Sequence, residues 1–380
     1  MTQVTLTRFR NYSFERLEVT PAPVVLTGPN GAGKTNILEA LSLLTPGRGL
    51  RSSPFAELAC SSATGVSQTW GVAAQTGGPA GEVDLGTSWN GQQGPGGQSA
   101  GRQVKVLGEI KKGSGALGDH MRMLWLTPSM DRLFSGPASD RRRFLDRLTV
   151  SFDSGHGAQV QAFEKLMRER NRLLENGSGN GAWLDSIEYK MADAAVAVAA
   201  ARRAAVDALK PLLAASGGAS TSGHFPWVEI SLEGDLEEMM GGHAAIEVEE
   251  WFRQKLDESR ERDRAAGRML SGPHRSDLKV KHGPKGLEAR YCSTGEQKAL
   301  LIGIVLAHAR VIKAAFEGYC PILLLDEVAA HLDERRREGL FDEIKALGAQ
   351  AWMTGTDKNL FEAYGADAQF FAVNDGKVHS

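Results

Sequence analysis

The stretch GPNGAGKT at residues 28–35 most constrains the fold of this chain, because it fits G-x-x-x-x-G-K-[ST] in full. It directly follows the apolar residues 24–27 and precedes residues 36–44, which have helical spacing. A strand, a glycine-rich loop and a helix in this order form a phosphate-binding loop. Its backbone N–H groups surround the phosphates of a nucleotide, Lys34 reaches their β and γ oxygens, and Thr35 binds Mg²⁺. We therefore expect nucleotide binding at Gly28, Pro29, Asn30, Gly31, Ala32, Gly33, Lys34 and Thr35.

A second segment, PILLLDE at residues 321–327, carries two acidic residues near the other end of the chain. Four apolar residues followed by acids are typical of a buried parallel strand with the acids at its carboxyl end. Asp326 is expected to orient Mg²⁺ through water, and Glu327 to polarise the water that attacks the terminal phosphate. Glu327 and Lys34 are therefore the catalytic candidates, and hydrolysis is favoured over phosphate transfer. Read alone, PILLLDE is equally a core strand that ends in an acidic turn.

The separation of these two segments predicts how the 380 residues are divided. Simple nucleotide kinases and small GTPases place the acidic strand much nearer the loop, so a large insertion must fold elsewhere. Helical spacing in the middle of the chain supports this division, because it begins near residue 160 and continues to about residue 264. We predict an α/β lobe built from both ends of the chain, residues 1–150 and 270–380, with an inserted helical lobe at residues 151–269.

A third segment, STGEQK at residues 293–298, opens a predicted helix about thirty residues before the acidic strand. The N-terminus of a helix offers unpaired N–H groups and a positive dipole end, both of which suit an anion. The phosphate-binding loop already supplies one such helix start. Ser293 and Gly295 are therefore expected to meet the γ-phosphate of a nucleotide held by a second copy of the chain, so that two chains enclose two nucleotides. Read alone, they are an ordinary helix cap and turn.

Composition limits the partners and the compartment. Forty-four basic against forty-six acidic residues leave a formal charge of −2, so a nucleic-acid surface must be a local basic patch. Three cysteines without a C-x-x-C pair indicate neither a zinc site nor a disulfide framework and fit a reduced, cytoplasmic protein. The polar N-terminus is not that of a signal peptide, and the longest apolar run, residues 299–307, is too short to span a membrane. We expect no membrane partner.

Taken together, these segments resemble the RecF family of bacterial recombination and repair ATPases, which belongs to the SMC-like group with ABC-type heads. The resemblance runs nearly from end to end, and four segments separate this family from other heads. These are FRNY at 9–12, RRRFLD at 141–146, RNRLL at 170–174 and GPHRSD at 272–277. The resemblance implies an ABC-type P-loop ATPase head with a short antiparallel helical arm.

The resemblance also implies partners and residue roles. It implies an ATP-dependent homodimer that binds double-stranded and gapped DNA or single-strand/double-strand junctions, with slow, DNA-stimulated hydrolysis of ATP. It implies work with RecR and RecO in loading RecA. By motif, Ser293 and Gly295 would touch the partner's γ-phosphate, and Asp333 would lie at the dimer seam.

The sequence departs from the family pattern at three places. Ser129 stands where the family often has Glu or Gln, and the signature reads S-T-G-E-Q rather than the L-S-G-G-Q of transporter-type ATPases. After the last core strand, where many such ATPases carry a switch histidine, this chain has TGTD at 354–357, which leaves Thr356 or Asp357 for that role.

Clusters of arginine provide candidate DNA contacts. On a helix, residues 168 and 172 share a face, and such arginines can bind phosphates without reading sequence. The alternatives are a solvated face or pairing within the chain, for example with Asp146. The residues that we predict to contact DNA are Arg168, Arg172, Arg202 and Arg203, whereas Arg141–Arg143 are candidates for a structural role.

Three other classes of protein compete with this interpretation. An ATPase subunit of a transporter-like assembly would have a membrane partner and no affinity for DNA. A P-loop kinase leaves STGEQK and the spacing to PILLLDE unexplained. A nuclease with an ATPase head would need a metal-binding acidic cluster beyond the ATPase residues, and the sequence indicates none.

Overall fold

The computed structural model describes residues 1–62, 65–66, 68–78, 81–91, 101–176, 181–215 and 224–379. These residues form two compact units, each described here by itself. Unit 1 contains the described residues of 1–131 and 294–379 together with His224 and Phe225, and unit 2 contains those of 132–215 and 226–293.

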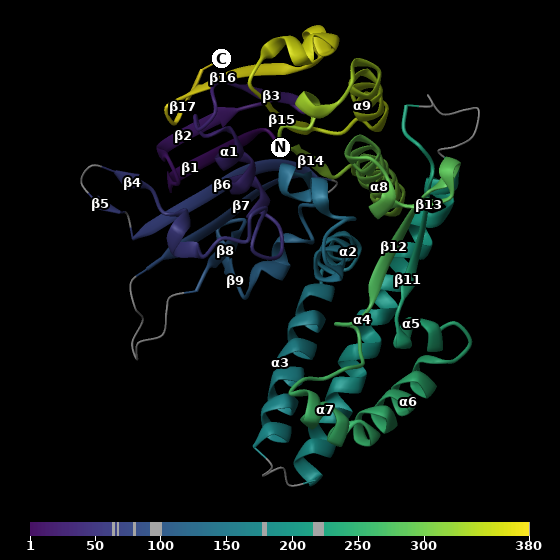
Figure 1. The fold of residues 1–380 in the computed structure, drawn as a ribbon. Helices are drawn as coiled ribbons and strands as arrows, with labels where there is room; N and C mark the ends of the chain where they lie inside the picture. Colours follow the sequence, from purple (N-terminus) through teal and green to yellow (C-terminus); the bar gives the residue numbers. More distant parts are fainter. Residues whose placement is uncertain are drawn as a thin grey trace. The chain divides into compact units, whose positions relative to one another are not determined.

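A mainly parallel sheet forms the centre of unit 1. Four of its strands, β10, β14, β15 and β3, are almost entirely buried, as β14 illustrates with ILLL, because a parallel sheet is normally covered on both faces. Strands from both ends of the chain lie side by side in it, which Figure 1 shows as purple beside yellow and green. Only the last pair, β16 and β17, is antiparallel. Across the sheet the order is β10 (Met123–Leu126), β14 (Ile322–Leu325), β15 (Ala351–Gly355), β3 (Val24–Thr27), β16 (Gln369–Asn374) and β17 (Lys377–His379).

An antiparallel sheet shares the core of unit 1. Alternating residues of its first strand, such as Val4 and Leu6, belong to one apolar cluster with Val24, Leu26 and Trp352 of the parallel sheet. The order is β2 (Tyr12–Glu18), β1 (Gln3–Phe9), β6 (Thr69–Gly78), β7 (Gly81–Asn90), β8 (Gln103–Val106) and β9 (Glu109–Lys111), and a separate pair is formed by β4 (Ser61–Ser62) and β5 (Gly65–Val66).

Three α-helices accompany these sheets. The helix α1 packs against β1 and β15, and α8 packs against β10 and α9. The bounds are α1 (Lys34–Ser42), α8 (Thr294–Ala315) and α9 (Glu334–Leu347), with short 3-10 helices η1 (Phe55–Leu58), η2 (Ser114–Leu117), η3 (Pro128–Arg132), η6 (Ala329–His331) and η7 (Lys358–Asp367).

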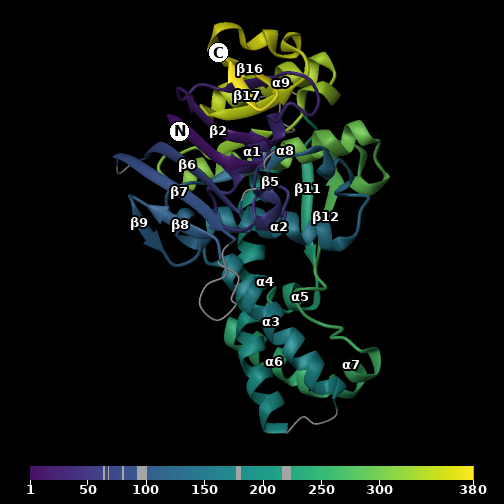
Figure 2. The ribbon, with the colours of Figure 1, turned by 90° about the vertical axis from the view of Figure 1, so that its left-hand side faces the viewer.

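Unit 2 is mainly helical. Its two long helices, α3 and α4, pack along each other, and α6 packs against α4 (Figures 1 and 2). Apolar side chains from α3, α4 and α6, among them Phe163, Met191 and Phe252, form its core. The helices are α2 (Ala138–Phe152), α3 (His156–Glu175), α4 (Gly181–Ala215), α5 (Asp235–Met239), α6 (Ala245–Glu258) and α7 (Arg260–Ala266); a small sheet contains β11 (Val228–Glu233), β12 (Asp277–His282) and β13 (Leu287–Glu288), with η4 (Gly283–Lys285) and η5 (Ala289–Tyr291).

The boundaries between the two compact units lie at residues 131/132 and 293/294. The sequence predicted these boundaries at 150/151 and 269/270. The helix α2 packs against β12 and α4, which keeps it within unit 2. Arg141 of α2 donates to both carboxylate oxygens of Asp277 on β12, at 2.7 and 2.9 Å. Because this ion pair and the β11–β12 pairing are contacts between distant segments, local composition does not mark them.

Among the helices that the structure describes, none is both long enough and apolar enough to cross a membrane.

Candidate nucleotide site

The loop at residues 28–33 connects β3 to α1, so the predicted strand, loop and helix are present. Gly28 and Gly33 have φ angles of 147° and 115°, a region that side chains disfavour. A Cβ atom at Gly33 would lie 2.7 Å from the hydroxyl oxygen of Tyr12, and one at Gly28 would overlap the carbonyl oxygen of Val373. Glycine is therefore required at both positions, because the backbone comes too close to its neighbours for any side chain.

Lys34 lies against its own loop. Its side chain is buried, and Nζ donates to the carbonyl oxygens of Gly28 and Pro29 at 2.7 and 2.9 Å. Burial lowers the pKa of Lys34, and the carboxylates of Glu327 and Asp326 partly offset this. The ammonium group is thus held at the mouth of the loop, in the position from which it can reach a bound phosphate.

Thr35 and Asp326 meet although 291 positions separate them in the chain. Thr35 Oγ1 donates to Asp326 Oδ1 at 2.8 Å, and Thr354 Oγ1 donates to the same oxygen at 2.8 Å. The backbone N–H of Glu327 donates in turn to Thr354 Oγ1 at 2.9 Å. These residues converge because β3, β15 and β14 are neighbouring parallel strands, whose carboxyl ends lie on one edge of the sheet.

The oxygens gathered at this edge suit a magnesium ion. A threonine hydroxyl and an aspartate carboxylate within hydrogen-bonding distance of each other are the hard oxygen donors that Mg²⁺ binds beside nucleotide phosphates. Glu327 follows directly and has a φ of 53°, a left-handed conformation that is unusual for a residue with a side chain. Thr35, Asp326 and Glu327 therefore lie at one edge of the sheet, and their roles with Mg²⁺ and water stay predictions.

The FRNY segment supports the phosphate-binding loop through side-chain hydrogen bonds. This function was not predicted from the sequence. Asn11 Nδ2 donates to the carbonyl oxygen of Ala32 at 3.0 Å, and Asn36 Nδ2 donates to Asn11 Oδ1 at 2.8 Å. Arg10 donates to both carboxylate oxygens of the buried Glu39 on α1, at 2.9 Å each. The signal was the segment itself, which spans the turn from β1 to β2 and carries two adjacent polar residues between aromatic ones.

The signature segment begins α8 at Thr294, directly after the exposed Ser293. Asp333 is the N-cap of α9 and accepts from the backbone N–H of Arg336 at 2.8 Å. The Arg336 side chain joins two predicted positions, since its Nη1 is 3.6 Å from Asp333 Oδ2 and 3.6 Å from where a Cβ at Gly295 would lie. Gly295 and Asp333 therefore belong to one surface.

Lys298, four residues after the start of α8, is a further charged group that interacts with Asp131 and Glu327. Its Nζ is 3.6 Å from Asp131 Oδ1, and the side chain is buried. Burial lowers its pKa, while Asp131 and Glu327 act in the opposite direction. Ser129, which replaces the acid or amide common in the family, hydrogen bonds with Thr127 at 2.8 Å. Sequence reasoning did not select Lys298, because an isolated lysine in an amphipathic helix carries no signal of its own.

The candidate DNA contacts of unit 2 differ in exposure. Arg168 and Arg172 on α3 are exposed, and Arg203 on α4 is half-buried beside Asp207, 3.5 Å away. Arg202 has only 3% of its surface exposed. Its guanidinium donates to both carboxylate oxygens of Asp146 at 2.7 and 3.0 Å and to the carbonyl oxygen of Pro273 at 2.6 Å. This corrects the expectation for Arg202, because a guanidinium that is buried and paired with a carboxylate is not accessible to DNA.

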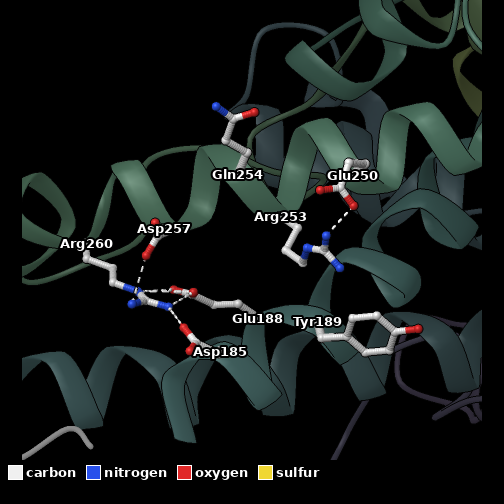
Figure 3. A pocket seen from close by; sticks show the side chains of 8 residues that line it. All are labelled: Asp185, Glu188, Tyr189, Glu250, Arg253, Gln254, Asp257 and Arg260. Carbon is white, nitrogen blue, oxygen red and sulfur yellow. Dashed lines mark hydrogen bonds and ion pairs between the residues drawn. The ribbon is translucent and has the colours of Figure 1, made fainter. Parts of the chain in front are cut away.

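An acidic cluster with a cavity of about 380 Å³ lies between α4 and α6 (Figure 3). Asp185, Glu188 and Asp257 converge there at a spacing that a metal ion could use. Arg260 already occupies the centre, with Nη2 2.5 Å from Asp185 and in contact with Glu188, and Nη1 2.8 Å from Asp257. The hydrogen bonds that Arg260 donates to the Glu188 carboxylate raise the pKa of Arg260. The cluster is therefore a structural ion-pair network and gives no support to a nuclease.

Known proteins are similar to this chain in sequence. The chain is 49% identical over 378 residues to the DNA replication and repair protein RecF of Mesorhizobium japonicum, with 100% of this chain and 97% of that protein covered. The RecF of Brucella suis is 49% identical over 376 residues, with 98% and 94% covered. A profile described as an AAA domain matches residues 3–77.

Solved structures agree in fold. A recombination mediator protein RecF with ATP, from the RecFOR pathway, has a TM-score of 0.82 at 23% identity, covering 100% of this chain and 96% of that chain. An Smc head bound to the C-winged helix domain of ScpA has a TM-score of 0.55 at 15% identity, covering 99% and 95%. The fold is that of an α/β ABC-type P-loop ATPase head.

Proposed function

The chain belongs to the RecF family of DNA replication and repair proteins, and we propose that it is the ATP-dependent DNA-binding component of recombinational repair and replication-fork maintenance. It is an ATPase with an ABC-type head. The observation that carries the proposal is the convergence of Lys34, Thr35, Asp326 and Glu327 at one edge of a parallel sheet. In this proposal the head binds ATP, two heads then join around it, and hydrolysis separates them.

The residues of the site divide the work of hydrolysis. Backbone N–H groups of residues 28–35 and the Lys34 ammonium would hold the phosphates of ATP, and Thr35 and Asp326 would hold Mg²⁺, directly and through water respectively. Mg²⁺ neutralises charge on the phosphate oxygens when it is bound. The Glu327 carboxylate would then orient the attacking water and accept a proton from it. The short bonds among Thr35, Asp326 and Thr354 support this assignment, because they hold the site ready before any ligand binds.

The second copy of the chain completes the site in this proposal. Ser293 and Gly295 would meet the γ-phosphate that the partner's loop holds, and Asp333 would lie at the seam between the two heads. Three observations support it: Ser293 and Asp333 are exposed, Gly295 lies beside Arg336, and the bonds of Lys34 and Thr35 involve none of them. An exposed helix start suits an anion brought by another molecule.

We assign DNA contact to Arg168, Arg172 and Arg203. Arg168 has 68% of its side chain exposed, with Glu164 Oε2 3.9 Å away, a distance at which an exposed ion pair is weak. Arg172 lies one turn further along α3, on the same face. Side chains of this kind bind phosphates of double-stranded or gapped DNA without reading bases. The proposal also includes RecR and RecO as protein partners in loading RecA, as the family implies.

The decisive experiment uses Glu327→Gln, which should bind ATP, hydrolyse it slowly and accumulate as a dimer. Its affinity for gapped, duplex and single-stranded oligonucleotides is measured by fluorescence anisotropy at fixed salt, with and without ATP, and its mass by light scattering. We expect ATP to double the mass and to strengthen binding to duplex-containing DNA. Lys34→Ala is the control, and it should show neither effect because it cannot bind ATP.

The two arginines are tested in the same assay. Arg168→Ala with Arg172→Ala should weaken DNA binding and reduce the slope of log affinity against log salt by roughly 0.9 for each DNA phosphate that the variant no longer neutralises. Arg16→Ala with Lys111→Ala removes two exposed charges from unit 1 and should leave the slope unchanged. An ATP-induced dimer of Glu327→Gln without affinity for DNA would contradict the DNA-binding function and favour an ATPase subunit of another ABC-type assembly.

A further inference from the structure

The hydroxyl of Thr354 joins the two acidic residues of the nucleotide site. Thr354 lies in β15, one residue before its end, and is 1% exposed. It donates to Asp326 Oδ1 at 2.8 Å and accepts from the backbone N–H of Glu327 at 2.9 Å. A hydroxyl has a single hydrogen, so the bond to Asp326 uses the only donor that the Thr354 side chain offers.

The bond from Thr354 to Asp326 determines the orientation of the Asp326 carboxylate. Thr35 and Thr354 both donate to Oδ1, from the start of α1 on one side and from β15 on the other. Two fixed donors on one oxygen hold the carboxylate plane and leave Oδ2 outside both bonds. If Thr35 binds a metal ion and gives up its bond to Asp326, the bond from Thr354 would still restrain Asp326, because Thr354 belongs to the buried strand β15.

The second bond determines the direction of the Glu327 side chain. Glu327 has a φ of 53°, a left-handed conformation that is unfavourable for a residue with a Cβ atom. The bond from Glu327 N–H to Thr354 contributes to holding the backbone in that conformation. Since the Cα–Cβ bond leaves from this backbone, a change in φ would move the carboxylate away from the water it must orient.

Two neighbouring residues, Thr356 and Asp357, are the ones expected to replace the switch histidine. Thr356 and Asp357 are both exposed. The Asp357 side chain caps the following 3-10 helix, because it accepts from the backbone N–H of Asn359 at 2.9 Å. Asp357 is therefore occupied in a local turn, and Thr354 is the residue of TGTD that bonds directly to the acids.

We propose that Thr354 is a positioning residue for ATP hydrolysis, which sets the Asp326 carboxylate and the Glu327 backbone before and during nucleotide binding. The inference rests on the proposed function, because it assigns to Thr354 a part in the same reaction. It adds that the buried hydroxyl of Thr354 connects β15 to the two acidic residues that follow β14.

The test compares Thr354→Val, which keeps the shape and removes the hydroxyl, with Thr354→Ser, which keeps the hydroxyl. We expect Thr354→Val to lower kcat by about 10- to 100-fold, as for a misplaced catalytic group, with the Kd for ATP changed less than about threefold. The Mg²⁺ concentration at half-maximal binding of a fluorescent ATP analogue should rise severalfold. Thr354→Ser should restore kcat and the Mg²⁺ midpoint to near the original values.

A readout without nucleotide separates positioning from general damage. Amide hydrogen exchange at Glu327 should be faster in Thr354→Val than in the parent protein, whereas exchange in β3 should be unchanged. If Thr354→Val does not fold, Thr354→Ala is measured in the same assays. Unchanged kcat, Mg²⁺ midpoint and Glu327 exchange in a folded variant would overturn the inference while leaving the proposed function intact. A parent protein that does not hydrolyse ATP would instead contradict the proposed function.

Discussion

At the scale of single residues, the arginines of α3 show how helix phase decides the role of a charge. Arg168 and Arg172 are exposed, whereas Arg170 between them has no exposed surface. Arg170 donates to Glu188 at 2.7 Å, to Asp263 at 2.7 Å and to the carbonyl oxygen of Leu256 at 2.7 Å. Two residues correspond to a rotation of about 200° around a helix, which takes a side chain from solvent to core.

Replacing Arg170 should destabilise unit 2 strongly. Arg170→Met keeps the volume but leaves Glu188 and Asp263 buried with less compensation, so the free energy of unfolding should fall by about 3–5 kcal/mol. Urea unfolding followed by tryptophan fluorescence measures this change. Arg168→Met on the exposed face is the matched control and should change it by less than about 0.5 kcal/mol. A similar small effect for Arg170→Met would show that the ion-pair network does not stabilise the unit.

At the scale of elements, one ion pair connects a helix to a strand in unit 2. Arg141 on α2 and Asp277 on β12 are each 15% exposed in their side chains, and the bond is bidentate. Burial of Asp277 tends to raise its pKa, but hydrogen bonds and charge from Arg141, with Lys279, outweigh burial and lower it. The ionised carboxylate is therefore the form that holds α2 on the small sheet.

The sign of the pKa shift gives the pH dependence of this connection. A carboxyl group with a lowered pKa contributes stability above its ordinary value of 3.8, and that contribution is lost as the pH falls through the folded-state value. Asp277→Asn should reduce the free energy of unfolding by about 1.5–3 kcal/mol at pH 7, and the difference should shrink as the pH falls below about 4. Urea unfolding at several pH values measures it, with Glu229→Gln on the exposed face of β11 as the control. An effect of Asp277→Asn that did not depend on pH would contradict the role of the charge.

At the scale of the whole molecule, the nucleotide site is assembled from distant parts of the chain. The loop lies at residues 28–35, whereas Asp326 directly follows β14 and Thr354 lies in β15, both near the other end of the sequence. The signature segment is exposed at Ser293 and, in our proposal, serves the nucleotide of a second copy. In this proposal each head contains two half-sites, whose functions can be separated by substitution.

Ser293→Arg should separate them. An arginine at the start of α8 should leave the Kd for ATP within about threefold of the parent value, because the loop is untouched, yet block the ATP-dependent dimer by steric clash. ATP hydrolysis should fall with the dimer. Analytical ultracentrifugation with ATP, together with binding of a fluorescent ATP analogue, measures both properties. Ser186→Arg on the exposed face of α4 should dimerise normally; a dimer of Ser293→Arg would refute the role given to the signature segment.

The local sequence determined those parts of the protein whose pattern lies within about twenty consecutive residues. Strand, glycine loop and helix at 24–44, the buried strand before Asp326, and the helix at 334–347 all follow from apolar periodicity and from glycine, which are local properties. The pairing of Thr35 with Asp326 was also foreseeable, because the carboxyl ends of parallel strands share an edge.

Only the tertiary structure decided which polar groups meet across distant segments. Thr354 joins Asp326 and Glu327 because β15 lies between β14 and β3. The periodicity of apolar residues along the chain does not specify this strand order. Arg202 is removed from solvent by Asp146, and α2 belongs to unit 2 through Arg141 and Asp277. The physical reason is common to all three: burial and ion pairing depend on which surfaces the folded chain brings together, and a residue's own neighbours in sequence do not specify them.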